Sequence, residues 1–97
     1  MFRLRFAYGA LEDLKGLRAH DRARIVAEIE RRLAEHPRAS RNRKELTALA
    51  PPWEHVPPIW ELRVGDHRVF YDVDTRARLV IVRAVRRKGR STTKEIV

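Results

Sequence analysis

The hydrophobic pattern is clearest between residues 59 and 85, where three short apolar segments are separated by two turn signals. Apolar and polar positions alternate in the first two segments. In Leu79 to Val85, apolar residues occupy both the odd and the even positions. Alternation predicts a strand with one buried face, and a continuous apolar run predicts a strand covered on both faces. We therefore expect three antiparallel strands joined by turns at Gly65-Asp66 and Asp74-Thr75.

The first of these turns determines how the first two strands pair. A glycine at its first position favours a type II′ turn, and counting outward then places Arg63 opposite Arg68 on one face. The apolar side chains share the other face: Trp60, Leu62, Val69 and Tyr71. Like charges directly opposite each other are mildly destabilising, so stability alone does not favour the arginine pair. Two interpretations stay open, namely solvated arginines that lean apart or an anion site on rigid backbone.

The first third of the chain changes its period. Residues 2–6 alternate apolar and basic side chains, which predicts a short strand at an edge of the sheet. Apolar residues then recur at helical spacing from about Tyr8 to near Arg18, and again from Asp21 until His36-Pro37 stops the pattern. Two amphipathic helices joined by so few residues form an antiparallel pair, and their apolar sides need the sheet as a partner.

No convincing period is present between Pro37 and Pro58, a segment that contains all five prolines. We interpret it as a long connection that Leu46 and Leu49 hold to the body of the protein. A proline-rich segment without a hydrophobic period is typical of a loop.

The end of the chain contains one further helix signal, since Thr92 and Glu95 have the spacing of a capping box and predict a helical turn over 93–97. Together these elements predict an α+β fold in a single domain over residues 1–97. An N-terminal strand is followed by an antiparallel helix hairpin and a three-strand antiparallel meander, and the helices pack on one face of a four-stranded sheet. The first strand lies beside the second hairpin strand or beside the last strand, and the sequence allows both.

The charge balance indicates the kind of partner. The chain has 22 Lys and Arg residues against 13 Asp and Glu residues, a formal charge of +9 and a sequence pI of about 11.2. This charge suits a nucleic acid, and an acidic protein would satisfy it as well. There is no cysteine, no signal-peptide pattern at the N-terminus and no stretch near the roughly 18 apolar residues of a membrane helix. We expect a cytoplasmic protein without a membrane partner.

The remaining candidate chemistry is cationic. Histidines and acids are not spaced like metal ligands, and neither a glycine-rich phosphate loop nor a serine-nucleophile motif is present, so we expect no metal and no cofactor. Arg63 and Arg68 could converge on one face with the basic run that follows the last strand. That run comprises Arg86, Arg87, Lys88 and Arg90, and the connection adds Arg41, Arg43 and Lys44.

A cationic surface of this kind grips phosphate groups, and it could also cleave RNA without a metal ion. Cleavage needs a base for the 2′-hydroxyl, cations that stabilise the phosphorane and an acid for the leaving oxygen. Arginine supplies the cationic role but hardly deprotonates. Lys88 is the better candidate for proton transfer, provided that the surrounding positive charge weakens its hold on the proton.

The chain resembles the RelE/ParE superfamily of toxins from bacterial type II toxin-antitoxin systems in the segment WELRVGDHRVFYDV, Trp60 to Val73. The apolar strand, the Arg-Lys-Gly-Arg tail and the preceding helix pair extend the resemblance over nearly the whole chain. RelE-like members are implied to be ribosome-dependent endonucleases that cut mRNA in the A site and leave a 2′,3′-cyclic phosphate. ParE-like members are implied to inhibit DNA gyrase, and in both cases a cognate antitoxin neutralises the toxin by wrapping around it.

Carried over by position, the resemblance implies that Arg68 is the catalytic arginine of the second hairpin strand and that Arg63 is a basic residue of the first. Lys88, or Arg87 if the register slips, matches the basic residue past the last strand, and Arg90 follows closely.

Two positions depart from the RelE pattern. Glu61 occupies a position that is basic in RelE, and the C-terminal tyrosine has no counterpart, with Lys94 near its place. Three functions therefore stay open. We favour an mRNA endonuclease that acts on the ribosome; the alternatives are a gyrase inhibitor and a degenerate toxin that only binds its antitoxin.

Overall fold

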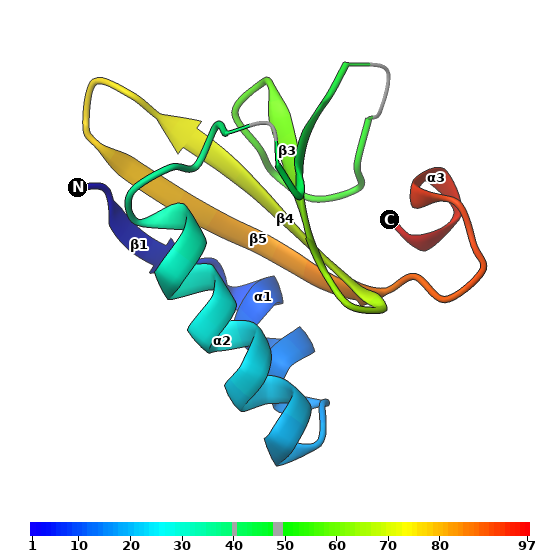
Figure 1. Ribbon diagram of the computed structural model, residues 1–97. Helices are drawn as coiled ribbons and strands as arrows, with labels where there is room; N and C mark the ends of the chain where they lie inside the picture. Colours follow the sequence, from blue (N-terminus) through cyan, green and yellow to red (C-terminus); the bar gives the residue numbers. More distant parts are fainter. Residues whose placement is uncertain (40, 48–49) are drawn as a thin grey trace.

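The computed structural model describes residues 1–39, 41–47 and 50–97. Its elements are β1 (Arg3–Phe6), α1 (Tyr8–Lys15), α2 (Ala19–Leu33), β2 (Arg43–Leu46), β3 (Ile59–Val64), β4 (His67–Asp74), β5 (Leu79–Arg87) and α3 (Thr93–Ile96). One sheet has the order β1-β5-β4-β3-β2, in which β1 is parallel to β5 and the other neighbours are antiparallel. Figure 1 shows α1 and α2 together on one side of this sheet and α3 on the other.

The β3–β4 hairpin has the register predicted from its turn. Gly65 has a φ of 57°, the positive value that a type II′ turn needs at its first position. Arg63 lies opposite Arg68, and Trp60 lies opposite Tyr71 with the ring centroids 6.4 Å apart. The apolar side of the hairpin faces α1 and α2, and we call the opposite side of the sheet the outer face.

The main core lies between the sheet and the two long helices. Ile25, Ile29 and Leu33 recur every four residues along α2, so they share one helix side, and all three are buried. Ala10 and Leu14 of α1 join them against the apolar side chains of β3, β4 and β5. Burial of each large aliphatic side chain contributes about 1.5–3 kcal/mol, which makes this layer the main source of stability.

The sheet has five strands, so the prediction of four was wrong. Residues Arg43–Leu46, which we expected in an irregular connection, pair antiparallel with β3 and form one edge of the sheet. An edge strand is held by backbone hydrogen bonds on one side and commonly carries charged side chains. Because this segment reads RKEL, its apolar pattern gave no indication of a strand. Leu49, the other proposed anchor of the connection, lies outside the described residues.

The first strand takes the second of its two predicted places, beside the last strand, and forms the other edge. α1 ends at Lys15 rather than near Arg18, because the weak helix former Gly16 follows. α2 begins at Ala19, ahead of the predicted Asp21, which lies in its first turn. The described chain contains no helix that is both long and apolar enough to cross a membrane.

The helices leave the outer face uncovered, but other segments of the chain cover its centre. Trp53, from the loop before β3, packs on Phe70 with ring centroids 5.4 Å apart. Ile96 and Val97 pack against the same small cluster. The predicted capping box of Thr92 is present and starts α3, which brings these apolar residues onto the sheet. Open surface on the outer face therefore lies toward the tip of the β3–β4 hairpin.

Candidate nucleic-acid interface

The two paired arginines of the hairpin have different environments. Arg63 is exposed, whereas the side chain of Arg68 is only 11 % exposed. Nη1 of Arg68 donates hydrogen bonds of 2.9 Å to the carbonyl oxygens of Gly65 and His67. Its Nε lies 3.7 Å from Oε1 of Glu61. One arginine is therefore held in place by three oxygen atoms, and the other extends into solvent.

Glu61 supplies the carboxylate that forms the ion pair with Arg68. Its side chain is 9 % exposed, and Oε1 also accepts a hydrogen bond of 2.7 Å from Oγ1 of Thr93 in α3. A buried carboxylate is tolerated when a cation and a hydroxyl donor satisfy it, as they do at this position. The residue that departs most from the RelE pattern thus connects the arginine pair to the C-terminal helix.

A pocket of about 220 Å³ opens beside these residues, between β2 and the hairpin. It is lined by Asn42, Arg43, Lys44, Glu61, Arg63 and Arg68. Lys44 lies opposite Glu61 in the β2–β3 register, so both side chains project from the same face of the sheet. Three cationic side chains, those of Lys44, Arg63 and Arg68, share this face with the one carboxylate and give the pocket a positive potential, which suits a phosphate group.

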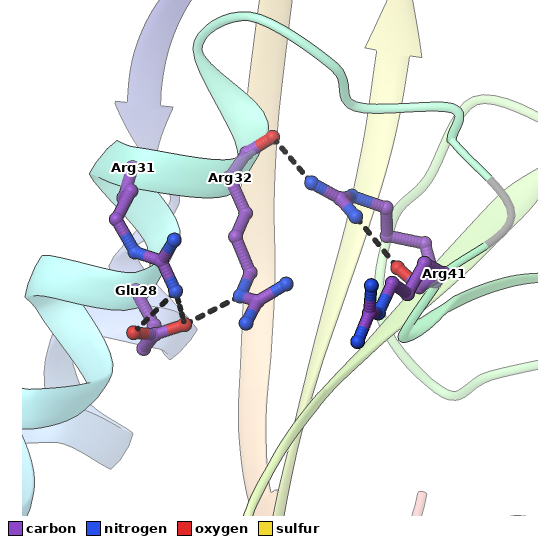
Figure 2. A network of polar contacts seen from close by, with 5 residues as sticks. Glu28, Arg31, Arg32 and Arg41 are labelled. Carbon is purple, nitrogen blue, oxygen red and sulfur yellow. Dashed lines mark hydrogen bonds and ion pairs between the residues drawn. The ribbon is translucent and has the colours of Figure 1, made fainter.

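Arg43 uses its guanidinium mainly for structure. Its Nη2 donates to the carbonyl of Arg32 at 3.0 Å, and its Nη1 donates to the carbonyl of Arg41 at 2.6 Å. Figure 2 shows the hydrogen bonds to the carbonyl groups of Arg32 and Arg41 beside the ion pairs of Glu28 on α2. A cation is favourable at the carbonyl end of a helix, which is where Arg43 contacts α2. Burial of the guanidinium lowers the pKa of Arg43. Arg43 thus ties the end of α2 to β2, while the side chain of Arg41 stays exposed.

The end of β5 carries two of the predicted cations in different settings. Arg86 forms an ion pair with Asp13 of α1, and its guanidinium carbon lies 5.4 Å from the ring centre of Trp53. Arg87 lies opposite His67 and lines a separate groove with it. The two arginines therefore do not serve a common site.

Lys88 and Arg90 follow β5. Lys88 is half-buried, and its backbone N–H donates to the carbonyl of Asp66 at 2.6 Å. Arg90 comes after Gly89, whose φ of 54° turns the chain, and its side chain is exposed. Neither residue is among those that line the 220 Å³ pocket.

Four of the predicted residues therefore meet in one pocket, namely Arg43, Lys44, Arg63 and Arg68. Our sequence reasoning missed Glu61 and Asn42 as members of it. Alternation along β3 was a usable signal for Glu61, because it places this residue on the same face as Arg63. Nothing in the pattern marked Asn42. Among the described residues, no three His, Asp or Glu side chains are grouped so that they could hold a metal ion.

The fold, with its helix pair on one side of a mixed sheet, is similar to that of solved RelE toxin-antitoxin structures. The fold matches the RelBE2 toxin-antitoxin complex of Mycobacterium tuberculosis with a TM-score of 0.72 and 23% identity, covering 89% of this chain and 90% of that one. It matches the archaeal RelE-RelB complex of Pyrococcus horikoshii OT3 with a TM-score of 0.72 and 18% identity, covering 93% and 98%. For the intact E. coli RelBE complex the values are 0.68 and 21%, covering 88% and 94%. At sequence identities this low, the structural similarity shows the fold alone.

The family follows from the sequence itself. A family model described as ParE toxin of type II toxin-antitoxin system, parDE, matches residues 4–91. No curated protein sequence matches the chain. Because the family model spans most of the chain, this protein belongs to the ParE toxin family and is a type II toxin of the RelE/ParE type. The resemblance inferred from the hairpin sequence is confirmed.

Proposed function

We propose that this toxin is a metal-independent endoribonuclease that cuts translated mRNA on the ribosome and thereby inhibits translation. The supporting observation is the pocket in which the carboxylate of Glu61 lies among Lys44, Arg63 and Arg68. A carboxylate can accept a proton and guanidinium groups can stabilise a phosphorane, so the pocket offers two of the three groups that RNA cleavage needs.

The roles of Glu61, Arg68 and Arg63 follow from their contacts, whereas that of Lys88, which lies outside the pocket, follows from its chemistry. The 2′-oxygen attacks phosphorus as its proton passes to Glu61, and the P–O5′ bond breaks, leaving a 2′,3′-cyclic phosphate. Arg68 is already fixed by backbone carbonyls, so it is preorganised to stabilise the charge that develops on the phosphate oxygens. Exposed Arg63 assists it. Lys88 is the proposed acid that protonates the leaving 5′-oxygen.

Primer extension on a translated message tests this proposal. Induction of the wild type should produce new 5′ ends in the message. Arg68→Ala should reduce cleavage by about 10²–10³-fold, as loss of a charge-stabilising donor does, and Glu61→Gln by about 10²–10⁴-fold through loss of the base. Arg76→Ala, which removes an exposed arginine from the β4–β5 turn, is the matched control and should cleave normally. An intact message in growth-arrested wild-type cells would remove the proposal.

A second candidate function is inhibition of DNA gyrase without nuclease activity. Two observations favour it. The matching family model is that of ParE, and the guanidinium of Arg68 is occupied by internal acceptors rather than open to a phosphate. A supercoiling assay with purified gyrase separates the two functions, because a nuclease should leave supercoiling unchanged.

We also propose that a cognate antitoxin binds this toxin in the cytoplasm. The solved relatives from M. tuberculosis, P. horikoshii and E. coli are complexes with an antitoxin. The charge of +9 calls for an acidic partner, and exposed Tyr8 and Leu11 on α1 offer apolar contacts. A pull-down with the product of the neighbouring gene tests this interaction. A toxin that binds that product but neither arrests growth, cuts RNA nor inhibits gyrase would be a degenerate member.

A further inference from the structure

A second cationic groove lies on the other side of the hairpin tip. It has a volume of about 460 Å³ and is formed by the α1–α2 turn, the start of α2, the β3–β4 turn and the end of β5. Its charged and titratable lining residues are Arg18, Arg24, Arg87, His67, Asp21 and Asp66. These residues come from three separate segments of the chain, so the fold itself brings Arg87 to the arginines of residues 18–24.

The polar contacts of the arginines in this groove differ from those of Arg68 and Arg86. Over the described ranges 1–39, 41–47 and 50–97, the side chains of Arg18, Arg24 and Arg87 form neither a hydrogen bond nor an ion pair. Asp21 and Asp66 line the same groove but lie beyond ion-pair distance from them. With three arginines against two carboxylates, the groove keeps a positive balance that favours an anion.

The guanidinium group of Arg24 lies over the β3–β4 turn. A Cβ atom added to Gly65 would lie 3.1 Å from Nη1 and 3.2 Å from Nη2 of Arg24, so the guanidinium rests against the bare backbone of the turn. Gly65 also needs its φ of 57°, which side chains rarely adopt. The glycine therefore serves both the turn and the placement of this cation.

The groove and the 220 Å³ pocket lie on opposite faces of the sheet near the tip of the β3–β4 hairpin. His67 lies opposite Arg87 and faces the groove, and the next pair along the same strands is Arg68 opposite Arg86. Alternation sends these successive pairs to opposite faces, so positive side chains surround the hairpin tip. A single phosphate ion can contact the cations on one face of the hairpin tip. A nucleic-acid strand, with a phosphate at every nucleotide, can contact the cations on both faces.

We propose that this groove binds backbone phosphates of single-stranded RNA, as a second contact separate from the proposed cleavage pocket. The lining favours RNA over an acidic protein segment, because Leu17 is its one large apolar side chain and a peptide would find little apolar surface to pack against. The inference concerns binding and does not require that the protein cuts RNA.

Binding of a labelled 12-nucleotide 2′-O-methyl RNA, measured by fluorescence anisotropy over a range of salt concentrations, tests the proposal. This probe lacks the 2′-hydroxyl nucleophile and so reports binding without cleavage. Loss of one phosphate contact lowers the salt slope by about 0.7, so the double variant Arg18→Gln/Arg24→Gln should lose about 1.4 in slope and bind about 25-fold more weakly at 0.1 M salt. The charge-retaining double variant Arg18→Lys/Arg24→Lys should keep most of the affinity.

A control with the same net charge is Arg38→Gln/Arg76→Gln, since both arginines are exposed and lie outside the groove. If it weakens binding as much as the groove variant, the RNA responds to overall charge and the proposal is wrong. Unchanged RNA binding with weaker antitoxin capture would assign the groove to a protein partner. Full displacement of RNA by millimolar inorganic phosphate at constant ionic strength would assign it to free phosphate. If the double variant fails to fold, Arg18→Gln alone should still weaken binding about 5-fold.

Discussion

Replacement of Asp72 tests how the fold holds the loop that covers the outer face. Asp72 is 1 % exposed, and its Oδ2 accepts hydrogen bonds of 2.8 Å from Nε of Arg83 and from the backbone N–H of Val56. Arg83 is the extra residue of a β-bulge, because Phe70 pairs with Ala84 and the next residue, Tyr71, pairs with Val82. The carboxylate thus connects β4 to both the bulge and the loop before β3.

The cost of Asp72→Ala follows from this burial. The side chain of Arg83 is only 13 % exposed, so the variant leaves a largely buried guanidinium without its counter-charge. Removal of one partner from a buried ion pair costs about 3–5 kcal/mol, a large share of the roughly 5–15 kcal/mol that stabilises a domain. With a urea m-value of about 2 kcal/mol/M, the unfolding midpoint should fall by about 2 M. The double variant Asp72→Ala/Arg83→Met should recover part of this loss, since no unpaired charge stays buried.

Urea unfolding followed by tryptophan fluorescence measures both effects. Glu30→Ala on the exposed side of α2 is the control, and its change should stay within about 0.5 kcal/mol. A loss below about 1 kcal/mol for Asp72→Ala would refute the reasoning, as would a double variant no more stable than the single one.

Three further predictions concern other contacts. Burial raises the pKa of Tyr71, whose hydroxyl donates to a backbone carbonyl, and Tyr71→Phe should lose about 1–2 kcal/mol in urea unfolding. Gly65→Ala should cost about 1–2 kcal/mol in the same assay because it strains a positive φ and crowds Arg24. The hydrogen bond from Arg32 lowers the pKa of Glu28 below 4.5. Its stabilisation is thus present above pH 4.5 and is lost as the pH falls through the lower folded value, so Glu28→Gln should flatten the acid limb of the stability curve.

The β3–β4 hairpin could be predicted from the sequence because two local signals agree there. Gly65 specifies the turn and strict alternation specifies the face, so the pairing of Arg63 with Arg68 followed without knowledge of the rest of the chain. β2 could not be predicted, since its residues satisfy backbone hydrogen bonds at an edge and bury little apolar surface. The information that makes it a strand lies in its neighbour β3.

The candidate site could be predicted only as a set of cations. Sequence shows that Arg68 is on the outer face, but its ion pair with Glu61 depends on a diagonal contact, and the contact of Glu61 with Thr93 depends on where the C-terminal helix packs. Arg86 illustrates the same limit, because its partner Asp13 is far away in the sequence. Ion pairs between residues far apart in the sequence decide which cations are free, and the local residue pattern does not reveal these pairs.

This division between paired and unpaired arginines decides how toxicity data should be interpreted. Arg68→Ala leaves the carboxylate of Glu61 buried without its cation, so loss of toxicity in that variant mixes lost chemistry with lost stability. Arg63 is exposed and lines the same pocket, so Arg63→Ala removes the proposed phosphate contact while the buried network stays intact. Loss of RNA cleavage in Arg63→Ala with an unchanged unfolding midpoint would assign the effect to the pocket. Loss confined to Arg68→Ala, together with a lower midpoint, would assign it to the fold.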